Sequence, residues 1–253
     1  MRQQKSHETG PTAVPILNVP VHAVTMADVL ALIERFMTEP RLHQIATVNP
    51  EFVMTAQEDG DFLRVLEAAD LCIPDGVGLL WAARRQGRPL PERVAGSDLV
   101  YELARLAAAN RWRLYLLGAA EGVAEEAAAV LQGLYPELAI AGTYAGSPDP
   151  AENQAIVDRI NQSQAQMLCV AYGAPRQDKW IARNREALPT VRLAMGVGGS
   201  LDFITGRSRR APEWAQRAGV EWLVRLAREP WRWRRMTALP RFALKVLAGR
   251  HRR

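Results

Sequence analysis

Asp75 stands at a place in the sequence where a carboxylate could do chemistry. It separates a short apolar run, residues 71–73, from residues 77–81, whose apolar side chains predict the start of a helix. One interpretation is structural, because aspartate commonly caps the helix that follows it. The other is a general base, which requires a carboxylate on a rigid element within reach of a substrate hydroxyl. The two roles are compatible, and the pattern alone favours the cap.

The elements that would position Asp75 alternate between strand and helix. A strand or hairpin is expected in the ILNVPVHAVT segment, and continuous apolar runs predict six further strands at 44–48, 71–73, 113–119, 138–145, 165–173 and 191–198. Helices are expected at 26–37, 97–110 and 121–133, and also after Asn49-Pro50, after Gly76, after the SPDP turn and from Pro175. This order predicts an α/β fold with a mostly parallel sheet that is covered by helices on both faces.

Polar side chains that follow such strands should share a crevice, because ligands of open parallel sheets lie beyond the carboxyl ends of the strands. The residues that this rule selects are Thr47, Asn49, Asp75, Gly118, Tyr144, Gln177 and Asp202.

Two glycine-rich turns, GAAEG at 118–122 and GVGGS at 196–200, follow predicted strands as nucleotide-binding loops do. Neither completes the G-x-G-x-x-G pattern, and neither is followed by the Gly-Lys-Ser/Thr of a phosphate-binding loop. These incomplete motifs argue against both NAD binding and ATP hydrolysis. The four histidines have no metal-ligand spacing, so no metal site is assigned.

Charge divides the chain into an acidic body and a basic tail. From Thr205 to Arg253 there are 14 Lys and Arg against 3 Asp and Glu, whereas the remaining residues carry 18 against 24. We therefore expect a disordered N-terminus at 1–14, an α/β core at 15–204 and a basic appendage at 205–253. The N-terminus lacks the apolar core of a signal peptide, and Cys72 and Cys169 lie in apolar runs like buried reduced thiols, which favours a cytoplasmic protein.

The basic appendage also holds four of the seven tryptophans, a combination typical of a membrane surface or a phosphate-rich ligand. Its last segment places Leu239, Phe242 and Val246 on one helical face with Arg241 and Lys245 opposite, so it could lie in a lipid headgroup layer. Packing on the sheet or on a second copy in a homo-oligomer fits this pattern equally. Arg225, Arg228, Arg232 and Arg235 form a stripe that is either a solvated face or a set of forks for a diphosphate.

The segments TVNPEF, ADLCIPDGVGLLWAAR, RVAGSDL, GAPRQDKWI, GVGGSLDFITG, RAPEW and GVEWLVRLAREPWRWRRM run in order from Thr47 to Met236. As an ordered set they resemble the WecG/TagA/CpsF family of bacterial glycosyltransferases. The resemblance implies a Rossmann-like core with a C-terminal appendage. It also implies transfer of N-acetylmannosamine, or its uronic acid, from a UDP-sugar donor to GlcNAc on undecaprenyl diphosphate, with inversion to a β-1,4 linkage. The protein would act in the synthesis of a cell-surface polysaccharide or a teichoic-acid linkage unit.

The same resemblance implies roles for individual residues. Asp75 matches the proposed catalytic base, and Thr47, Asn49, Arg93, Gln177 and Asp202 match residues of the substrate pocket, to which we add Tyr144 as a substrate-binding candidate. Arg225, Arg232 and Arg235 match appendage arginines thought to reach the diphosphate, which suggests activity without a metal or other cofactor because the chain has no D-x-D. The family more often has Glu at position 178, so Asp178 is left out of the catalytic set.

Two alternatives remain. One is a related enzyme that transfers another hexose, such as glucose, in exopolysaccharide synthesis. The other is a non-catalytic module that binds nucleotide-sugars or nucleic acid through the tail, although basic residues with amphipathic helical spacing argue against nucleic acid. The leading expectation is an enzyme on the inner face of the cell membrane, with no nucleic acid among its partners.

Overall fold

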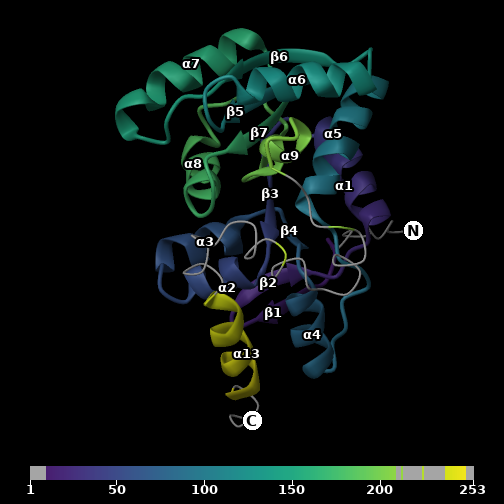
Figure 1. The fold of residues 1–253 in the computed structure, drawn as a ribbon, viewed down its shortest axis with the longest axis vertical. Coiled ribbons are helices and arrows are strands. Elements are labelled where there is room, and N and C mark those ends of the chain that lie inside the picture. The colour runs from purple at the N-terminus through teal and green to yellow at the C-terminus, as the bar shows by residue number, and fades with distance from the viewer. Residues whose placement is uncertain (1–9, 209–211, 213–223, 225–236, 249–253) are drawn as a thin grey trace, which may run out of the picture.

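The computed structural model describes residues 10–208, 212, 224 and 237–248. Its centre is a six-stranded sheet in which every neighbouring pair is parallel, in the order β4-β3-β8-β7-β5-β6 (Figure 1). The strands are β3 (His43–Val48), β4 (Leu71–Pro74), β5 (Arg113–Gly118), β6 (Ala139–Tyr144), β7 (Met167–Ala171) and β8 (Leu193–Gly196). The predicted α/β class with a parallel sheet is confirmed.

Helices cover both faces of this sheet, as the continuous apolar strands predict. One face packs against α1 (Met26–Thr38), α5 (Gly96–Asn110), α6 (Val123–Leu134) and α9 (Ser200–Ile204). The other face divides in two: α2 (Pro50–Ala56), α3 (Gly60–Ala68) and α4 (Val77–Arg85) pack with the β3 and β4 half, and α7 (Asn153–Ser163) and α8 (Arg176–Asn184) with the β5 and β7 half. A short 3₁₀ helix, η1 (Pro150–Glu152), precedes α7.

A two-stranded antiparallel hairpin, β1 (Ala13–Ile16) and β2 (Val19–His22), packs beside β4. It begins two residues before the start expected for the core, and Val14 is already buried. The imidazole Nδ1 of His22 accepts a hydrogen bond from the backbone N–H of Cys72 at 2.9 Å, which ties the hairpin to the sheet. Cys72 and Cys169 are free and buried, as expected, and burial raises the pKa of both thiols.

Helix starts are fixed by local side chains. Thr25 and Asp28 form a reciprocal capping box at α1, and the amide oxygen of Asn49 accepts the N–H of Phe52 at 3.0 Å to cap α2, with Pro50 in its first turn. The cap predicted for Asp75 is wrong, because α4 begins at Val77 and its N-cap residue is Gly76, with no side-chain cap. The carboxylate of Asp75 turns instead toward another helix.

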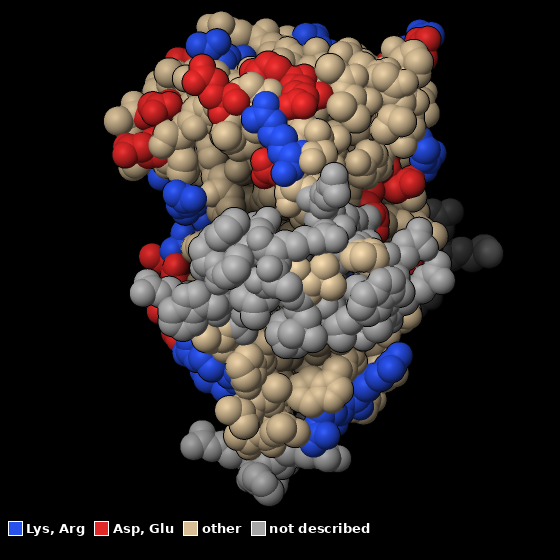
Figure 2. All heavy atoms as spheres, in the orientation of Figure 1, with Lys and Arg blue, Asp and Glu red and all other residues tan. Residues whose placement is uncertain are grey.

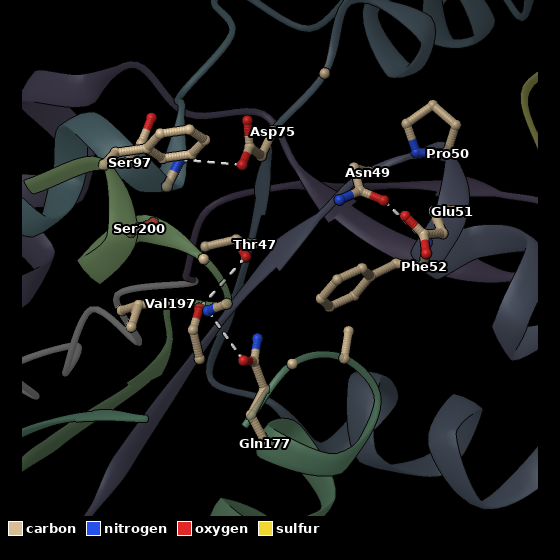
Figure 3. A pocket seen from close by; sticks show the side chains of 18 of the residues that line it. Thr47, Asn49, Pro50, Glu51, Phe52, Asp75, Ser97, Gln177, Val197 and Ser200 are labelled. Carbon is tan, nitrogen blue, oxygen red and sulfur yellow. Dashed lines mark hydrogen bonds between the residues drawn. The ribbon is translucent and has the colours of Figure 1, made fainter. Parts of the chain in front are cut away.

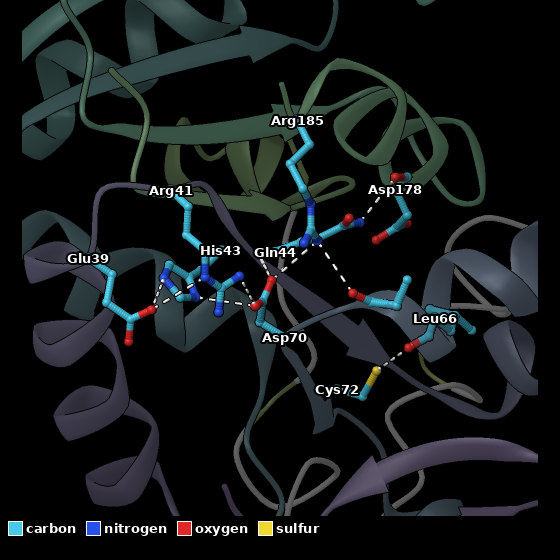
Figure 4. Close-up of polar contacts among 10 residues, drawn as sticks. Glu39, Arg41, His43, Gln44, Leu66, Asp70, Cys72, Asp178 and Arg185 are labelled. Atoms are coloured by element: carbon cyan, nitrogen blue, oxygen red, sulfur yellow. Dashed lines mark hydrogen bonds and ion pairs between the residues drawn. The ribbon is translucent and has the colours of Figure 1, made fainter. Parts of the chain in front are cut away.

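The amino ends of β3 and β4 are joined by a polar cluster centred on Asp70 (Figure 4). Its carboxylate accepts the N–H of Gln44 at 2.9 Å and pairs with Arg41 at 2.6 Å and Arg185 at 3.2 Å. The buried ring of His43 lies 3.3 Å from the same carboxylate. The cluster connects the loop before β3, the start of β4 and the end of α8, at the edge of the sheet opposite the pocket described below.

The last described helix, α13 (Ala238–Ala248), packs mainly against α2 and also touches α4 (Figure 1). Phe242 is buried in the cluster that α2 and α4 share, and Val246 packs against it. The helix therefore turns much of its predicted apolar face to the body of the protein and leaves Leu244 and Leu247 exposed. Among the described residues, no helix combines the length and apolarity needed to cross a bilayer.

Candidate active site

A pocket of about 540 Å³ opens at the carboxyl edge of the sheet, where β3 and β8 lie side by side. The segment after β3 turns into α2 on one face of the sheet, and the segment after β8 turns into α9 on the other. Neighbouring parallel strands whose continuations leave to opposite faces open a crevice between them, the usual ligand position in open α/β sheets. The volume lies within the roughly 300–1,000 Å³ typical of sites for small molecules.

Five of the predicted polar site residues in the core line this pocket together with Asp75. They come from four different segments of the chain and are Thr47, Asn49, Arg93, Gln177 and Asp202. Figure 3 shows Thr47, Asn49, Asp75 and Gln177 converging from the ends of β3, β4 and the start of α8. The rule that polar residues after parallel strands share a crevice therefore holds for these positions.

Asp75 is held at the rim of the pocket by the start of α5. Its Oδ2 accepts the backbone N–H of Gly96 at 3.1 Å (Figure 3), and its Oδ1 lies 3.9 Å from a guanidinium nitrogen of Arg93. The amino end of a 15-residue helix favours a negative charge. About a quarter of the Asp75 side chain remains exposed to the pocket. The arrangement fixes the carboxylate in one direction while leaving it accessible.

Gln177 forms the floor of the pocket beneath the loop after β8. It is 2% exposed, and its Oε1 accepts the N–H of Gly198 at 3.0 Å (Figure 3). The side chain lies directly against the backbone of Gly196, where a Cβ atom would come within 2.4 Å of its Nε2. Gly196 is therefore required for the close approach of β8 to α8, and the amide orientation of Gln177 is set by two backbone contacts.

Thr47 and Asn49 occupy the end of β3, on either side of the point where α2 begins. The hydroxyl of Thr47 reaches the carbonyl of Gly196 at 3.5 Å, and its methyl group lies under Gly96, where a Cβ would approach it to 2.7 Å. The side-chain oxygen of Asn49 accepts the hydrogen bond that caps α2, so its amide nitrogen is the group that can donate to a ligand.

The prediction that Tyr144 shares this pocket is wrong. Tyr144 ends β6, the edge strand, which β5 and β7 separate from β8. Its ring stacks under the guanidinium of Arg159 at 4.5 Å instead of facing the pocket. Neighbouring strands are about 4.8 Å apart, so the four strand spacings between β6 and β3 place Tyr144 beyond the reach of a side chain at β3. The sequence marked it as following a strand but could not show which strand it followed in space.

Several lining residues were not selected from the sequence. Glu51 lies in the first turn of α2, Ser97 in the first turn of α5 and Ser200 at the start of α9. The sequence feature that could have identified these three residues is their position, because each is the first or second residue of a helix that follows a strand or loop. Arg207 also lines the pocket and pairs with Glu126 of α6 at 2.8 Å. Arg225, Arg232 and Arg235 lie outside the described residues.

Asp178 follows Gln177 but points into the protein rather than into the pocket. Its carboxylate is fully buried, and neither oxygen has a hydrogen-bond partner among the described residues. Its backbone carbonyl accepts the side-chain amide of Gln44 at 3.0 Å (Figure 4). Burial raises the pKa of this carboxyl to about 7. Asp178 is thus an interior acid, directly behind the floor of the site, whose ionisation is unfavourable.

This raised pKa predicts a pH-dependent stability. Between about pH 4, the usual pKa of an unfolded aspartate, and pH 7, the folded protein keeps a proton that the unfolded chain has lost. The free energy of unfolding should therefore fall as pH rises through this window. Asp178→Asn should remove that fall, so that the variant gains stability relative to the wild type between pH 5 and pH 8 in urea titrations.

Asp158→Asn on the exposed face of α7 is the matched control. Its free energy of unfolding should depend on pH in the same way as that of the wild type. A wild type and Asp178→Asn variant whose difference in unfolding free energy is the same at pH 5 and pH 8 would contradict a protonated interior carboxyl.

The fold and the pocket together define the class of this protein: an α/β domain with a ligand site at the switch point of a parallel sheet, in which one carboxylate is fixed at the rim. The family description "Glycosyl transferase WecG/TagA/CpsF family" matches residues 14–253. The chain belongs to this family, which confirms the resemblance seen in its motifs.

Named relatives cover nearly the whole chain. An N-acetylglucosaminyldiphosphoundecaprenol N-acetyl-beta-D-mannosaminyltransferase of Bacillus subtilis (strain 168) is 33% identical over 233 residues, 92% of this chain and 90% of the relative. Proteins of the same name from Bacillus spizizenii and from Staphylococcus aureus (strain MRSA252) are 35% and 30% identical, over 80% and 94% of this chain and 78% and 94% of those relatives.

Proposed function

We propose that this protein is an inverting glycosyltransferase that moves N-acetylmannosamine from its UDP donor to GlcNAc on undecaprenyl diphosphate, forming a β-1,4 linkage. The observation that carries the proposal is Asp75, an acid held at the pocket rim by the N–H of Gly96 and accompanied by Arg93. The name shared by relatives at 30–35% identity supports the choice of acceptor and sugar.

In the proposed reaction Asp75 acts as the general base. Its carboxylate takes the proton from the 4-hydroxyl of the acceptor GlcNAc as that oxygen attacks C1 of the donor sugar. The new C–O bond forms on the face opposite the departing UDP, so the configuration at C1 inverts. The proton ends on Asp75, and the electron pair of the broken bond leaves with the diphosphate. A base positioned in this way typically contributes about 10²–10⁴-fold to the rate.

Thr47, Asn49, Gln177 and Asp202 would hold the nucleotide and the donor sugar. They line the pocket from the end of β3, the start of α8 and helix α9. Their hydroxyl, amide and carboxylate groups suit the hydroxyls of a sugar and the edge of uracil, which require paired donors and acceptors in fixed directions. The buried hydrogen bond of Gln177 to Gly198 keeps one of these groups rigid before the ligand arrives.

The negative charge that develops on the leaving diphosphate requires cations. We assign this role to Arg225, Arg232 and Arg235 of the appendage, in place of a divalent metal. The pocket itself offers Arg93 and Arg207 at its rim, which supports an electrostatic route through guanidinium groups. Preorganised donors of this kind are worth about 10²–10³ each in kcat. A membrane surface is proposed as the partner of the appendage, on the cytoplasmic side where nucleotide-sugars are found.

The decisive experiment measures UDP release from the purified chain. With UDP-N-acetylmannosamine and a GlcNAc-diphosphate-lipid analogue, we expect UDP and a disaccharide-lipid in equal amounts, in EDTA as well as in buffer. UDP formation only when the acceptor is present identifies a transferase, whereas ligand binding without turnover would leave a nucleotide-sugar binding module. A donor screen with UDP-glucose distinguishes the related hexosyltransferase through the mass of the product.

The appendage arginines should matter for catalysis and not for folding. Replacing Arg225, Arg232 and Arg235 together by Gln should lower kcat by at least about 10²-fold, because neutral amides cannot balance the diphosphate charge. Arg64→Gln, an exposed arginine on α3, is the matched control and should retain full activity. Turnover of the triple variant at the wild-type rate in EDTA would remove these residues from the mechanism.

A further inference from the structure

Arg207 lines the pocket from a turn that follows α9, three residues beyond the end of that helix. Gly206 has a φ of +74°, the left-handed conformation that ends many helices, and its N–H donates to the carbonyl of Phe203 at 3.2 Å. The N–H of Ser208 donates to the carbonyl of Asp202 at 3.0 Å. The backbone on both sides of Arg207 is therefore tied to α9, so this arginine belongs structurally to the core.

The side chain of Arg207 is held by α6. Its Nε donates to Oε2 of Glu126 at 2.8 Å, and the two side chains are 48% and 43% exposed. Figure 2 shows acidic side chains gathered over the part of the molecule where α6 lies, with Lys or Arg atoms directly against them. Among the described residues, the Nη groups of Arg207 have no hydrogen-bond partner. The Nη edge of the guanidinium is thus open to a ligand, and such an edge matches two oxygens of a phosphate.

The charges around the pocket distinguish Arg207 from the other cation there. The described lining residues include three acids and two arginines, which are Glu51, Asp75, Asp202, Arg93 and Arg207. Arg93 lies 3.9 Å from Asp75, the acid at the rim. Arg207 is paired instead with an acid of α6 that does not line the pocket. A ligand with two negative charges needs a cation that does not already accompany the proposed base, and Arg207 meets this requirement.

Arg207 and Asp75 also approach the pocket from different strands. Asp75 follows β4, whereas Arg207 follows the helix after β8, and β3 lies between these two strands. Two strand spacings are about 10 Å, which leaves room for a sugar ring between the two side chains. In an inverting transfer the base and the leaving group lie on opposite sides of C1. A diphosphate on the β8 side therefore matches a base on the β4 side.

We propose that Arg207 binds the diphosphate of the sugar donor through its Nη edge, and that Glu126 is a positioning residue that sets the guanidinium in place before the donor arrives. The assignment rests on the proposed function, because the diphosphate is that of a UDP-sugar. Its phosphates are already charged when the donor binds, so the contact contributes to donor affinity and affects mainly KM. The appendage arginines keep the separate role of balancing the charge that develops on the leaving group.

Glu126 has two opposing effects on such a site. Immobilising a long side chain on binding lowers an affinity by roughly two- to tenfold, and an arginine that is already held avoids that loss. The negative charge of Glu126, however, weakens the attraction between Arg207 and a phosphate. The ion pair itself adds little to stability, because both side chains are exposed. Variants of Glu126 can therefore separate position from charge without unfolding the protein.

The first test is calorimetric titration of the full chain with UDP and with uridine. Arg207→Gln should weaken UDP binding at least about tenfold, because a charged hydrogen bond to phosphate is lost, and should leave uridine affinity within about twofold of the wild type. Arg207→Lys keeps the charge without the fork and should recover only part of the loss. Arg105→Gln is the matched control, since it removes an exposed arginine that pairs with Glu102 at 2.8 Å outside the pocket lining, and it should bind both ligands like the wild type.

The second test compares two replacements of Glu126. Glu126→Gln keeps an oxygen that can accept the Nε–H of Arg207 but removes the charge, whereas Glu126→Ala removes both. The alanine variant should bind UDP roughly three- to tenfold more weakly than the glutamine variant, and this difference should vanish in the Arg207→Gln background. Thermal unfolding should give closely similar midpoints for all of these variants, as expected for an exposed ion pair.

Wild-type affinity of Arg207→Gln for UDP would overturn the proposal, as would an equal loss of affinity for uridine. A raised KM for the lipid acceptor with unchanged UDP affinity would assign Arg207 to the acceptor diphosphate and overturn it as well. Equal UDP affinities of Glu126→Gln and Glu126→Ala would remove the positioning role. UDP binding that depends on Arg207 without any sugar transfer would leave this site standing while the proposed function fails. Normal transfer with a UDP affinity that does not depend on Arg207 would do the reverse.

Discussion

Asp75→Asn should lower kcat by about 10²–10⁴-fold while leaving the affinity for UDP-sugar within a few-fold of the wild type. Asparagine has the same shape, and its amide oxygen can still accept the N–H of Gly96 that anchors the wild-type carboxylate at 3.1 Å. What it lacks is the basicity needed to take the hydroxyl proton of the acceptor. Steady-state kinetics with the lipid-linked acceptor, and calorimetric titration with UDP or UDP-sugar, measure the two quantities separately.

The control for this variant is Asp61→Asn, an acid on α3 that is 73% accessible and pairs with the exposed Arg64. It removes the same charge from the protein and should leave kcat unchanged. Near-normal turnover of Asp75→Asn would remove the general-base assignment. Loss of both binding and turnover would instead assign Asp75 a role in holding the donor, because the positions of Arg93 and the α5 start depend on it.

Gly196→Ala should lower kcat/KM by about 10²-fold, the cost that a displacement of roughly 1 Å in a site can have. The added methyl would lie 2.4 Å from Nε2 and 2.7 Å from Cγ of Gln177. Gln177 cannot move aside as a surface side chain would, because it is 2% exposed and is bonded to the N–H of Gly198. Overpacking of this kind also costs about 1–3 kcal/mol of stability, which thermal unfolding would measure.

A double-mutant cycle isolates the clash. Gln177→Ala removes the three atoms that lie nearest to the new methyl, so Gly196→Ala should cost little further activity or stability in that background. Gly133→Ala on α6 is the matched control for the glycine replacement, since a Cβ there meets nothing within 4 Å and should stabilise the helix by about 0.5–1 kcal/mol. Equal losses from Gly196→Ala with and without the Gln177 side chain would mean that the strand itself, and not Gln177, is disturbed.

The two predictions concern different parts of one arrangement. Asp75 supplies the proposed chemistry, and the contact of Gly196 with Gln177 fixes the floor against which the donor would lie. Asp178, directly behind that floor, has its raised pKa because the same packing excludes water from it. The pH-dependent stability of Asp178→Asn and the double-mutant cycle of Gly196 and Gln177 therefore both test the packing between the end of β8 and the start of α8. The activity of Asp75→Asn tests the chemistry proposed at the pocket above it.

The sequence by itself determined the elements and several of the polar residues that line the pocket. Mostly apolar runs predicted β3, β4, β5, β7 and β8 because a strand buried on both faces carries few polar side chains, and the buried polar residues of β3 lie near its two ends. Asn49-Pro50 predicted the start of α2 because the cap is a local hydrogen bond between neighbours in the chain. The rule for polar residues after strands then gathered Thr47, Asn49, Gln177 and Asp202 beside Asp75.

Only the tertiary structure decided how distant segments meet. The order β4-β3-β8-β7-β5-β6 arises from packing between strands far apart in sequence, and it places Tyr144 at an edge, away from the pocket that its local pattern suggested. Asp75 binds the start of α5 rather than α4, and α13 buries Phe242 against α2, because a side chain finds its partner across space. Local patterns record which surface a residue must hide or expose, whereas its partner depends on the free energy of the whole packed arrangement.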